Sequence, residues 1–265
     1  MEWKRVRNWL ILLVLAVDLF LAGNLAKQWL QAEQTLRQSA EDAVTIANQR
    51  GMAVSLENIL ALPEEMYLYE TRRSDELEQN AALALLEEDV LQESRGGGVS
   101  VYQTADGELA FRRGGALELH KPWVGEEFGS LKCTETLALA GMDTETALLR
   151  EYNGAVELTQ QFEELPVFNS RLMCTCEGNV LQVRGRWMLA EEPTAGSLGM
   201  TRAQLVLALC DLLEAKQVTA PETVQAGYYL LGEDAQSLTL EPVWAVETEQ
   251  GQLIMSCITG EQVNF

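Results

Sequence analysis

The sequence predicts an α+β protein in which an N-terminal single transmembrane helix is followed by antiparallel-sheet subdomains, each packed with helices. Three observations lead to this prediction. An apolar run occupies residues 8–26 of the 265-residue chain. Strand-like and helix-like segments alternate irregularly after residue 51, and one order of helix, strands and glycine turn occurs twice after residue 126. A hydrophobic content of 47% is typical of a folded core.

The apolar run predicts a membrane anchor over residues 1–27, including a short cytoplasmic tip. Its nineteen residues form about 28 Å of helix, close to the ~30 Å hydrocarbon core of a bilayer. Lys4, Arg5 and Arg7 precede it and only Lys27 follows directly, so the N-terminus is expected in the cytoplasm and the C-terminal region outside the cell. The alternative is a cleaved signal peptide, but Asp18 interrupts its apolar segment and no clean A-x-A site follows.

Asp18 lies near the midpoint of the predicted anchor. An aspartate at the centre of a transmembrane helix costs ~2.5–3.5 kcal/mol on insertion scales, and such residues commonly contact another helix. We therefore expect a transmembrane partner contact, while a protonated, merely tolerated Asp18 remains the other interpretation. The residues expected at this contact are Ile11, Val14, Asp18, Leu21, Ala22 and Leu25, with Leu15 beside them.

After the anchor, apolar residues at three- and four-residue steps predict a helical stalk over residues 28–50, which either packs on its own domain or meets a partner. Residues 51–122 form the first predicted extracellular α/β subdomain. It contains a strand at 66–70, a helix that begins at Ser74, and a hairpin over 99–111 with an Asp106-Gly107 turn. The three glycines at 96–98 lack the Gly-Lys-Ser/Thr of a phosphate loop.

Residues 123–265 form the second predicted extracellular region, with two related helix-plus-sheet units. The first unit has a helix at 131–140 and strands at 155–162, 165–168, 172–176 and 180–183. The second has a helix at 201–215 and strands at 228–231, 241–247 and 253–257. Both contain a strand that begins Pro-Val-aromatic and a later glycine turn, which indicates a weak internal repeat.

Charge and motif content narrow the function classes. The net charge is −21, and beyond Lys27 there are 15 cations against 38 acids, a surface that repels nucleic acid. His120 is the only histidine, lies in a loop-like stretch and has no Ser or Cys signature beside it, so we expect a surface or hinge residue. Motifs for zinc proteases, serine hydrolases and phosphate loops are absent. We therefore predict no enzyme activity, no catalytic residue, no cofactor and no metal site. Trp187, Trp244, Tyr228 and Tyr229 are expected in the core.

Five cysteines cannot all pair within the chain. Cys174 and Cys176 are two apart in a strand-like run and should point to one face, and no C-x-x-C or Cys/His spacing for zinc is present. Buried free thiols are the expected state, and a disulfide that involves Cys174 or Cys176 stays open outside the cell.

Both ends of the chain resemble the YycI (WalI) family. The opening Met-Glu-Trp-Lys-Arg runs directly into the anchor, and the family's anchor carries a polar residue near the place of Asp18. The closing block, Pro242-Val243-Trp244-Ala245-Val246-Glu247-Thr248 followed by Gly251 and Thr259-Gly260-Glu261, resembles that family and also PepSY-like units. Tyr228-Tyr229 fits the same pattern, and the middle of the chain matches only in element order.

The resemblance implies a non-enzymatic regulator of a sensor histidine kinase of the WalK/YycG type, a two-component regulatory system. It further implies that the protein joins the kinase and a YycH-like sister protein through transmembrane helices. The alternative is a surface-anchored PepSY-like inhibitory or chaperone module for an extracellular protease or cell-wall enzyme.

Overall fold

The computed structural model describes scattered positions between residues 27 and 60, and then residues 62–86, 90–123, 128–215, 223–232, 234–248 and 251–263. The chain divides into two compact units, Met1–Pro63 and Glu64–Phe265. The predicted anchor at residues 1–26 lies outside the described residues. Within the described part, no helix is long and apolar enough to cross a membrane.

In the first unit, every described position from residue 27 to residue 49 is helical. The Arg37 and Glu41 side chains pair four residues apart, with 3.3 Å between Nε and Oε1. The hydroxyl of Thr45 donates a hydrogen bond of 2.8 Å to the carbonyl oxygen of Glu41. These contacts have the spacing of helix neighbours. The bounds of the stalk stay a prediction.

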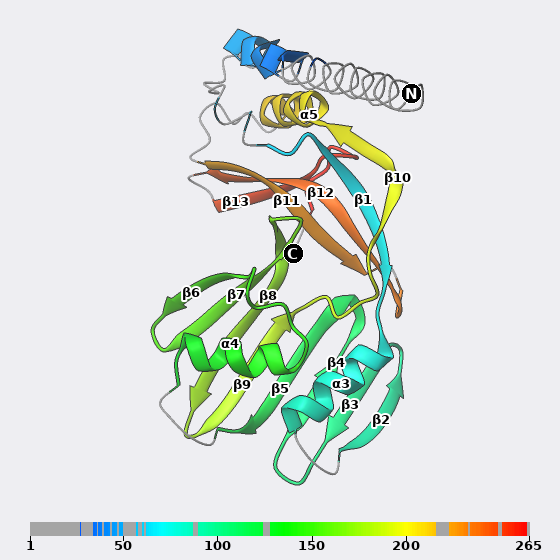
Figure 1. Cartoon of the computed structure of the whole chain (residues 1–265), viewed down its shortest axis with the longest axis vertical. Helices are drawn as coiled ribbons and strands as arrows, with labels where there is room; N and C mark the ends of the chain where they lie inside the picture. The colour runs from blue at the N-terminus through cyan, green and yellow to red at the C-terminus, as the bar shows by residue number, and fades with distance from the viewer. Residues whose placement is uncertain are drawn as a thin grey trace, which may run out of the picture. The chain divides into compact units, whose positions relative to one another are not determined.

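The second unit is a 13-stranded, mostly antiparallel sheet with three helices among its described residues (Figure 1). Its N-terminal elements are β1 (Glu65–Arg72), α3 (Asp75–Leu86), β2 (Leu91–Gly96), β3 (Val99–Gln103), β4 (Glu108–Phe111), a 3-10 turn η1 (Arg113–Gly115) and β5 (Ala116–Pro122). Its middle elements are α4 (Ser130–Leu139), β6 (Leu148–Tyr152), β7 (Ala155–Phe162), β8 (Leu165–Glu177) and β9 (Val180–Arg186). Its last elements are β10 (Thr194–Thr201), α5 (Arg202–Ala215), β11 (Thr223–Gly232), β12 (Ser237–Thr248) and β13 (Gly251–Ser256). The predicted α+β class is confirmed.

The strands run in the order β10-β1-β12-β11-β8-β9-β5-β4-β3-β2, with β13 on β12 and the β6–β7 hairpin on β8. The pairings β1–β12 and β5–β9 join segment 51–122 to segment 123–265. The two segments therefore share one sheet, and the predicted boundary between them stays a prediction.

Two parts of the sheet have the same local topology. In the α4 unit, helix α4 precedes the antiparallel meander β7-β8-β9; in the α5 unit, helix α5 precedes the antiparallel meander β11-β12-β13. The middle strand of each meander carries the Pro-Val-aromatic sequence, at Pro166-Val167-Phe168 in β8 and Pro242-Val243-Trp244 in β12. The strands predicted at 165–168 and 172–176 are one strand, β8, and β6 lies between α4 and β7, so the relationship between the two units stays a prediction.

The α4 unit and the α5 unit meet where β8 and β11 pair in parallel, at Val167 and Tyr228. The backbones approach closely here: a Cβ on Gly227 would lie 2.5 Å from the carbonyl oxygen of Pro166. Only glycine fits such an approach without a shift of the backbone. Gly227 therefore fixes the junction between the meanders.

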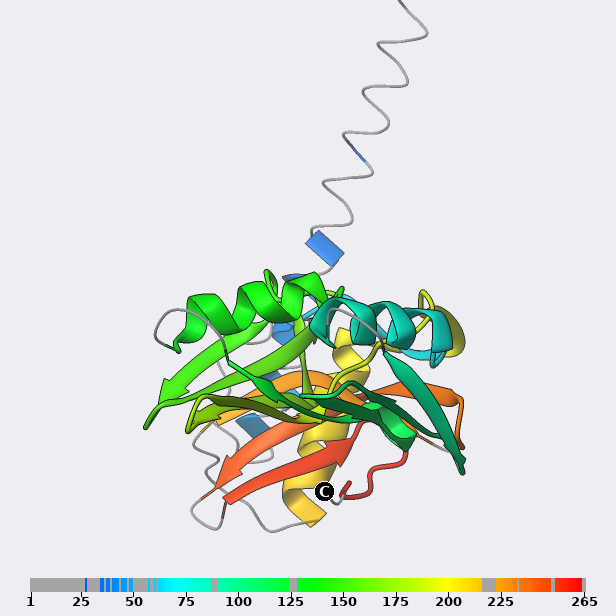
Figure 2. The ribbon, with the colours of Figure 1, turned by 90° about the horizontal axis from the view of Figure 1, so that it is seen from below.

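Helices α3 and α4 lie side by side on one face of the strands around β5 and β9 (Figure 2). The hydroxyl of Ser74 caps α3 by accepting the Leu77 amide at 3.3 Å, which confirms the predicted start. The core beneath the two helices contains Leu85, Leu109, Leu119, Cys133, Leu137, Leu158, Leu172, Cys174, Val183 and Trp187. The four aromatics predicted in the core are buried: Trp187, Trp244, Tyr228 and Tyr229.

Candidate functional site

The six residues predicted for the transmembrane contact lie outside the described residues, so the structure places none of them. The surface that the structure does describe offers a different candidate site, on the face of the sheet that α3 and α4 leave open. It consists of a polar depression around His120 and an adjoining row of arginines.

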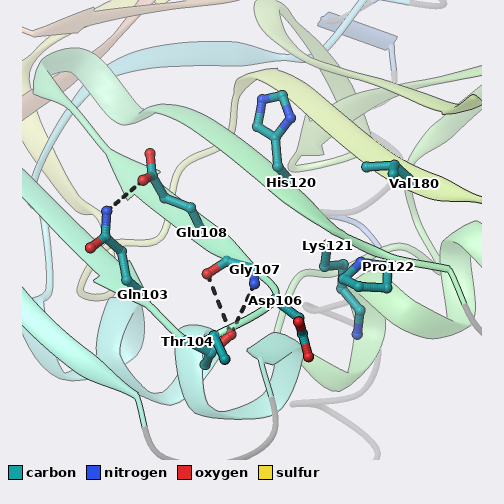
Figure 3. Close-up of a pocket in the computed structure, with 10 residues that line it drawn as sticks. Gln103, Thr104, Asp106, Gly107, Glu108, His120, Lys121, Pro122 and Val180 are labelled. Carbon is teal, nitrogen blue, oxygen red and sulfur yellow. Dashed lines mark hydrogen bonds between the residues drawn. The ribbon is translucent and has the colours of Figure 1, made fainter.

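The depression has a volume of about 440 Å³ and opens to solvent (Figure 3). Its lining comes from the β3–β4 turn, the end of β5 and the start of β9: Gln103, Thr104, Ala105, Asp106, Gly107, Glu108, His120, Lys121, Pro122 and Val180. Gln103 donates a hydrogen bond of 2.6 Å to Glu108, and the Gly107 amide donates one of 3.0 Å to the Thr104 hydroxyl. The turn is therefore held rigidly by its own side chains, and the depression presents polar groups.

The structure corrects the expected position of His120. It lies within strand β5, opposite Glu108 on β4 and Gln182 on β9, and not in a loop. Residues 116–120 alternate between half-buried and buried, which is the pattern of a strand with one face in the core. His120 is half-buried, with its Nε2 atom 3.3 Å from an oxygen of Glu118.

Glu118 lies next to His120 and is flanked by two arginine side chains. Its carboxylate lies 3.0 Å from Nε of Arg184 and 3.6 Å from Nη2 of Arg112. The hydrogen bond to His120, together with the two arginines, lowers the pKa of Glu118 below its usual value. The nearby guanidinium groups of Arg184 and Arg112 therefore favour the ionised form of the Glu118 carboxyl.

An arginine-rich row crosses five strands beside this cluster. The registers place Arg150 opposite Glu157, Glu157 opposite Met173, Met173 opposite Arg184 and Arg184 opposite Glu118. Directly paired residues lie on the same face of a sheet, so these five side chains form one continuous line across β6, β7, β8, β9 and β5. The Arg184 side chain is 60% exposed.

A second row adds Arg171 and Arg186 to the same face. Arg171 lies opposite Thr159, two residues from Met173, and Arg186 lies opposite Ala116, two residues from Arg184. Between them, a Cβ on Gly185 would lie 1.9 Å from the carbonyl oxygen of Arg171, and its φ of 146° favours glycine. Gly185 thus lets strands β8 and β9 approach closely beside the two arginines. Both arginines are half-buried.

Tyr152 completes this surface, which we call the arginine face: Arg150, Arg171, Arg184, Arg186, Tyr152, Met173, Glu118 and Glu157. The Tyr152 hydroxyl lies 3.1 Å from an oxygen of Glu157 and 3.6 Å from the sulfur of Met173. Partial desolvation and Glu157 raise the pKa of Tyr152, while Arg150 and Arg171 lower it. The two guanidinium groups therefore act on one hydroxyl.

Three of the four arginines form no close ion pair with a described residue, although Glu157 lies opposite Arg150 in the register. Among the described residues, no ion pair within 4.0 Å involves Arg150, Arg171 or Arg186, and the Nε atom of Arg171 is buried without a hydrogen-bond partner. The total charge of −21 conceals this local excess of arginine. The signal available in the sequence was the alternation of Gln182, Arg184 and Arg186 with apolar residues in one strand.

A second cluster, of aromatic residues, lies where the end of β7 in the α4 unit contacts β11 of the α5 unit and strand β1. The hydroxyl of Tyr69 donates a hydrogen bond of 2.6 Å to Glu163, and that of Tyr228 donates one of 3.4 Å to the other oxygen. The rings of Tyr69 and Phe162 pack edge to face at 4.7 Å, and those of Phe162 and Tyr228 at 5.4 Å. Burial and then Glu163 raise the pKa of Tyr69 to about 12. The backbone φ values of Glu163 and Glu164, 49° and 64°, are typical of a two-residue hairpin turn.

A buried ion pair connects β1 to α3. Arg73 is 5% exposed and Glu78 is 2% exposed. Nη2 of Arg73 donates to Oε2 of Glu78 at 2.9 Å, Nε donates to the other oxygen, and Nη1 donates to the carbonyl of Gly98. Burial raises the pKa of Glu78, and Arg73 acts against that rise. All donors point inward, so this pair is a structural tie between β1, α3 and the β2–β3 turn.

The cysteines are free thiols. Cys133, Cys174, Cys210 and Cys257 are buried, and Cys176 is half-buried. Cys133 lies in α4 and Cys174 in β8 within one core cluster, where the Cys133 thiol and burial raise the pKa of the Cys174 thiol. Among the described residues, no group of three or more His, Cys, Asp or Glu side chains is arranged to hold a metal ion.

No protein family and no curated protein matches the sequence. Among solved structures, an uncharacterized protein from Eubacterium rectale ATCC 33656 is similar at 12% identity and a TM-score of 0.42, over 77% of this chain and 88% of that one. The C-terminal domain of YpeB from Bacillus megaterium is similar at 10% identity and a TM-score of 0.29, over 73% of this chain and 99% of that one. At these scores neither structure carries an argument about function. The resemblance to the YycI family therefore depends on the residues at the two ends of the chain.

Proposed function

We propose that the protein is a membrane-anchored accessory regulator of a sensor histidine kinase, and that it acts through transmembrane and extracellular protein–protein contacts. The observation that carries the proposal is Asp18, an acid in the middle of an apolar run that follows Lys4, Arg5 and Arg7. An ionisable residue at this depth is costly in lipid and is a natural contact point for a second helix. The opening and closing blocks that resemble the YycI family add support.

The mechanism is a difference in binding. If the anchor packs better against one signalling state of the kinase, it shifts the equilibrium toward that state by its difference in affinity. A difference of ~1–3 kcal/mol gives a marked change in output. The proposed partners are a kinase of the WalK/YycG type and a YycH-like sister protein in the same cell membrane.

The test is co-purification of the full chain with the kinase from membranes in mild detergent, together with a reporter of kinase output. Asp18→Leu should leave insertion intact and weaken the association by ~1–2 kcal/mol, because the interhelical hydrogen bond is lost. Asp18→Asn is the matched control, since its amide still forms hydrogen bonds, and its effect should be milder. Equal association and equal output for Asp18→Leu and the unmodified chain would contradict the proposed contact.

The second candidate is a PepSY-like inhibitory or chaperone module for an extracellular protease or cell-wall enzyme. The repeated order of one helix and a three-stranded meander in the α4 and α5 units favours it. Gene neighbourhood separates the two candidates. A kinase and response-regulator operon supports the first, and an adjacent peptidase gene supports the second.

A further inference from the structure

We propose that the arginine face binds a carboxylate-rich segment of a partner protein outside the cell. This inference deepens the proposed function, on which it rests for its biological setting, by naming the surface and the chemistry of the extracellular contact.

The charge of the face is opposite to that of the whole chain. The chain carries −21, whereas the face has four arginines against Glu118 and Glu157. Glu118 already binds Arg184 and His120, which leaves Arg150, Arg171 and Arg186 without an ion pair among the described residues. The net charge of the chain repels an acidic ligand, so the local excess of arginine favours this face as the place of contact.

The composition of the face is that of an interface. Arginine, tyrosine and methionine are enriched where proteins bind each other, and lysine is depleted there. The arginine face holds four arginines, Tyr152 and Met173, and it contains no lysine. Guanidinium groups bind carboxylates through paired hydrogen bonds and lose little hydration energy on contact.

The face is also open. Helices α3 and α4 cover the opposite side of these strands (Figure 2). The β6 strand, which carries Arg150, is exposed at every residue and pairs only with β7. A segment of a partner can therefore lie across the strands from Arg150 to Arg184 without moving any described element. A second copy of this acidic chain is disfavoured as the occupant, because two chains of −21 repel each other.

The test uses the full chain in mild detergent and a fluorescent ten-residue polyglutamate peptide, with binding followed by anisotropy. The unmodified chain should bind the peptide at about 20 mM salt and less tightly at about 150 mM. The triple variant Arg150→Gln, Arg171→Gln, Arg186→Gln should bind at least about tenfold more weakly. The matched control removes the same charge elsewhere, with Arg37→Gln, Arg72→Gln and Lys132→Gln, and should bind within about twofold of the unmodified chain.

Two further variants keep the test decisive. Replacement of the same three arginines by lysine preserves charge but not the paired geometry, and should give an intermediate affinity. The single variant Arg150→Gln changes an exposed side chain, so its weaker binding is measurable even if the triple variant does not fold. Equal weakening by face and control variants, absence of binding to the unmodified chain, or preferential binding to vesicles of anionic lipid would each overturn the proposal. The assay contains no kinase, so its result is independent of the co-purification test.

Discussion

The α4 unit and the α5 unit have the same order of elements, but they cover their sheets differently. In the α4 unit, the residues of β8 alternate: Leu172 and Cys174 are buried beneath α4, whereas Met173 and Thr175, each one position further along, are half-buried on the open face. In the α5 unit, β12 is buried on both faces from Leu240 to Val246. The α4 unit therefore presents one sheet face to the surroundings, whereas the middle strand of the α5 unit is buried on both faces.

Different segments cover the two faces of strand β12 in the α5 unit. On one face, Trp244 lies against α5 and donates a hydrogen bond of 2.9 Å to the carbonyl of Leu205. On the other face, the C-terminal segment returns along β13, where the amide of Val263 bonds to Ile254 at 2.8 Å. The residues buried on this second face are Phe168, Tyr229, Val243, Ala245 and Ile254. Strands that are buried on both faces read as continuous apolar runs, as β12 does.

This difference assigns separate tasks to similar units. Strand β12 of the α5 unit has no free face from Leu240 to Val246, so this part of the closing block contributes stability. The α4 unit keeps its core on one side only, and its other side carries the arginine face. The polar residues of β8 and β9 are therefore an outward surface and not a defect in a core.

The largest expected difference in unfolding free energy is between an aspartate placed on β12 of the α5 unit and one placed on β8 of the α4 unit. Val243→Asp buries an unpaired carboxylate on the covered second face of β12 and should cost at least ~4 kcal/mol of unfolding free energy. Thr175→Asp places the same group on the open face of β8 and should cost ~1 kcal/mol or less. Chemical denaturation of the full chain in detergent, followed by tryptophan fluorescence, measures both.

Val243→Thr covers the case in which the aspartate variant does not fold. It keeps the shape of the side chain and adds one buried hydroxyl, which should cost ~1–3 kcal/mol. Similar losses at positions 175 and 243 would mean that the two sheets are covered alike, and the comparison would fail.

Variants of the buried Arg73–Glu78 pair test how firmly helix α3, which lies beside α4, is held to strand β1, which pairs with the α5 unit. Strand β1 pairs with β12 of the α5 unit, and α3 lies beside α4. Arg73→Met leaves Glu78 buried without its partner and should cost ~3–5 kcal/mol. Adding Glu78→Leu removes the stranded acid and should recover most of that loss. If the double variant stays as unstable as Arg73→Met, the hydrogen bond from Arg73 to Gly98, and not the ion pair, holds β1 to α3.

Segments with a strong local pattern were predictable from the sequence. Strand β7 was predicted at 155–162, where the structure has it, because its apolar alternation ends at a turn. The start of α3 followed from a serine cap. By contrast, β6 has no buried face, and β10 contains two glycines and lies at the edge of the sheet, so neither shows an apolar pattern. The one signal for β6 was Asn153-Gly154, whose φ values of 51° and 78° suit a tight hairpin turn.

The candidate site was less predictable because strand register, and not sequence proximity, assembles it. Arg150 and Arg184 are 34 positions apart and meet only through the pairing of β6, β7, β8 and β9. A total charge of −21 conceals a local cluster of the opposite sign. The position of His120 was wrong for a related reason: its strand is half polar, and its partners on β4 and β9 define it.

The smallest expected effect tests the contact between the two units at Tyr69, Tyr228 and Glu163. The pKa of Tyr69 is about 12 in the folded chain against an ordinary value of 10, because burial and Glu163 favour the neutral hydroxyl. The folded state therefore holds this proton more tightly than the unfolded state does. The stability that depends on it is fully present below pH 10 and is lost as the pH rises through 12.

Denaturation of the full chain and of Tyr69→Phe at pH 8 and at steps between pH 10 and 12 measures this contribution. At pH 8 the variant should be less stable by ~1–2 kcal/mol, because it lacks the hydrogen bond to Glu163. The gap should narrow between pH 10 and 12, where the hydroxyl of the unmodified chain ionises beside an acid. Phe162→Leu is the control, since it alters the same ring cluster without removing a titrating group, and its gap should stay constant. A constant gap for Tyr69→Phe as well would show that the tyrosine joins the two units by packing alone.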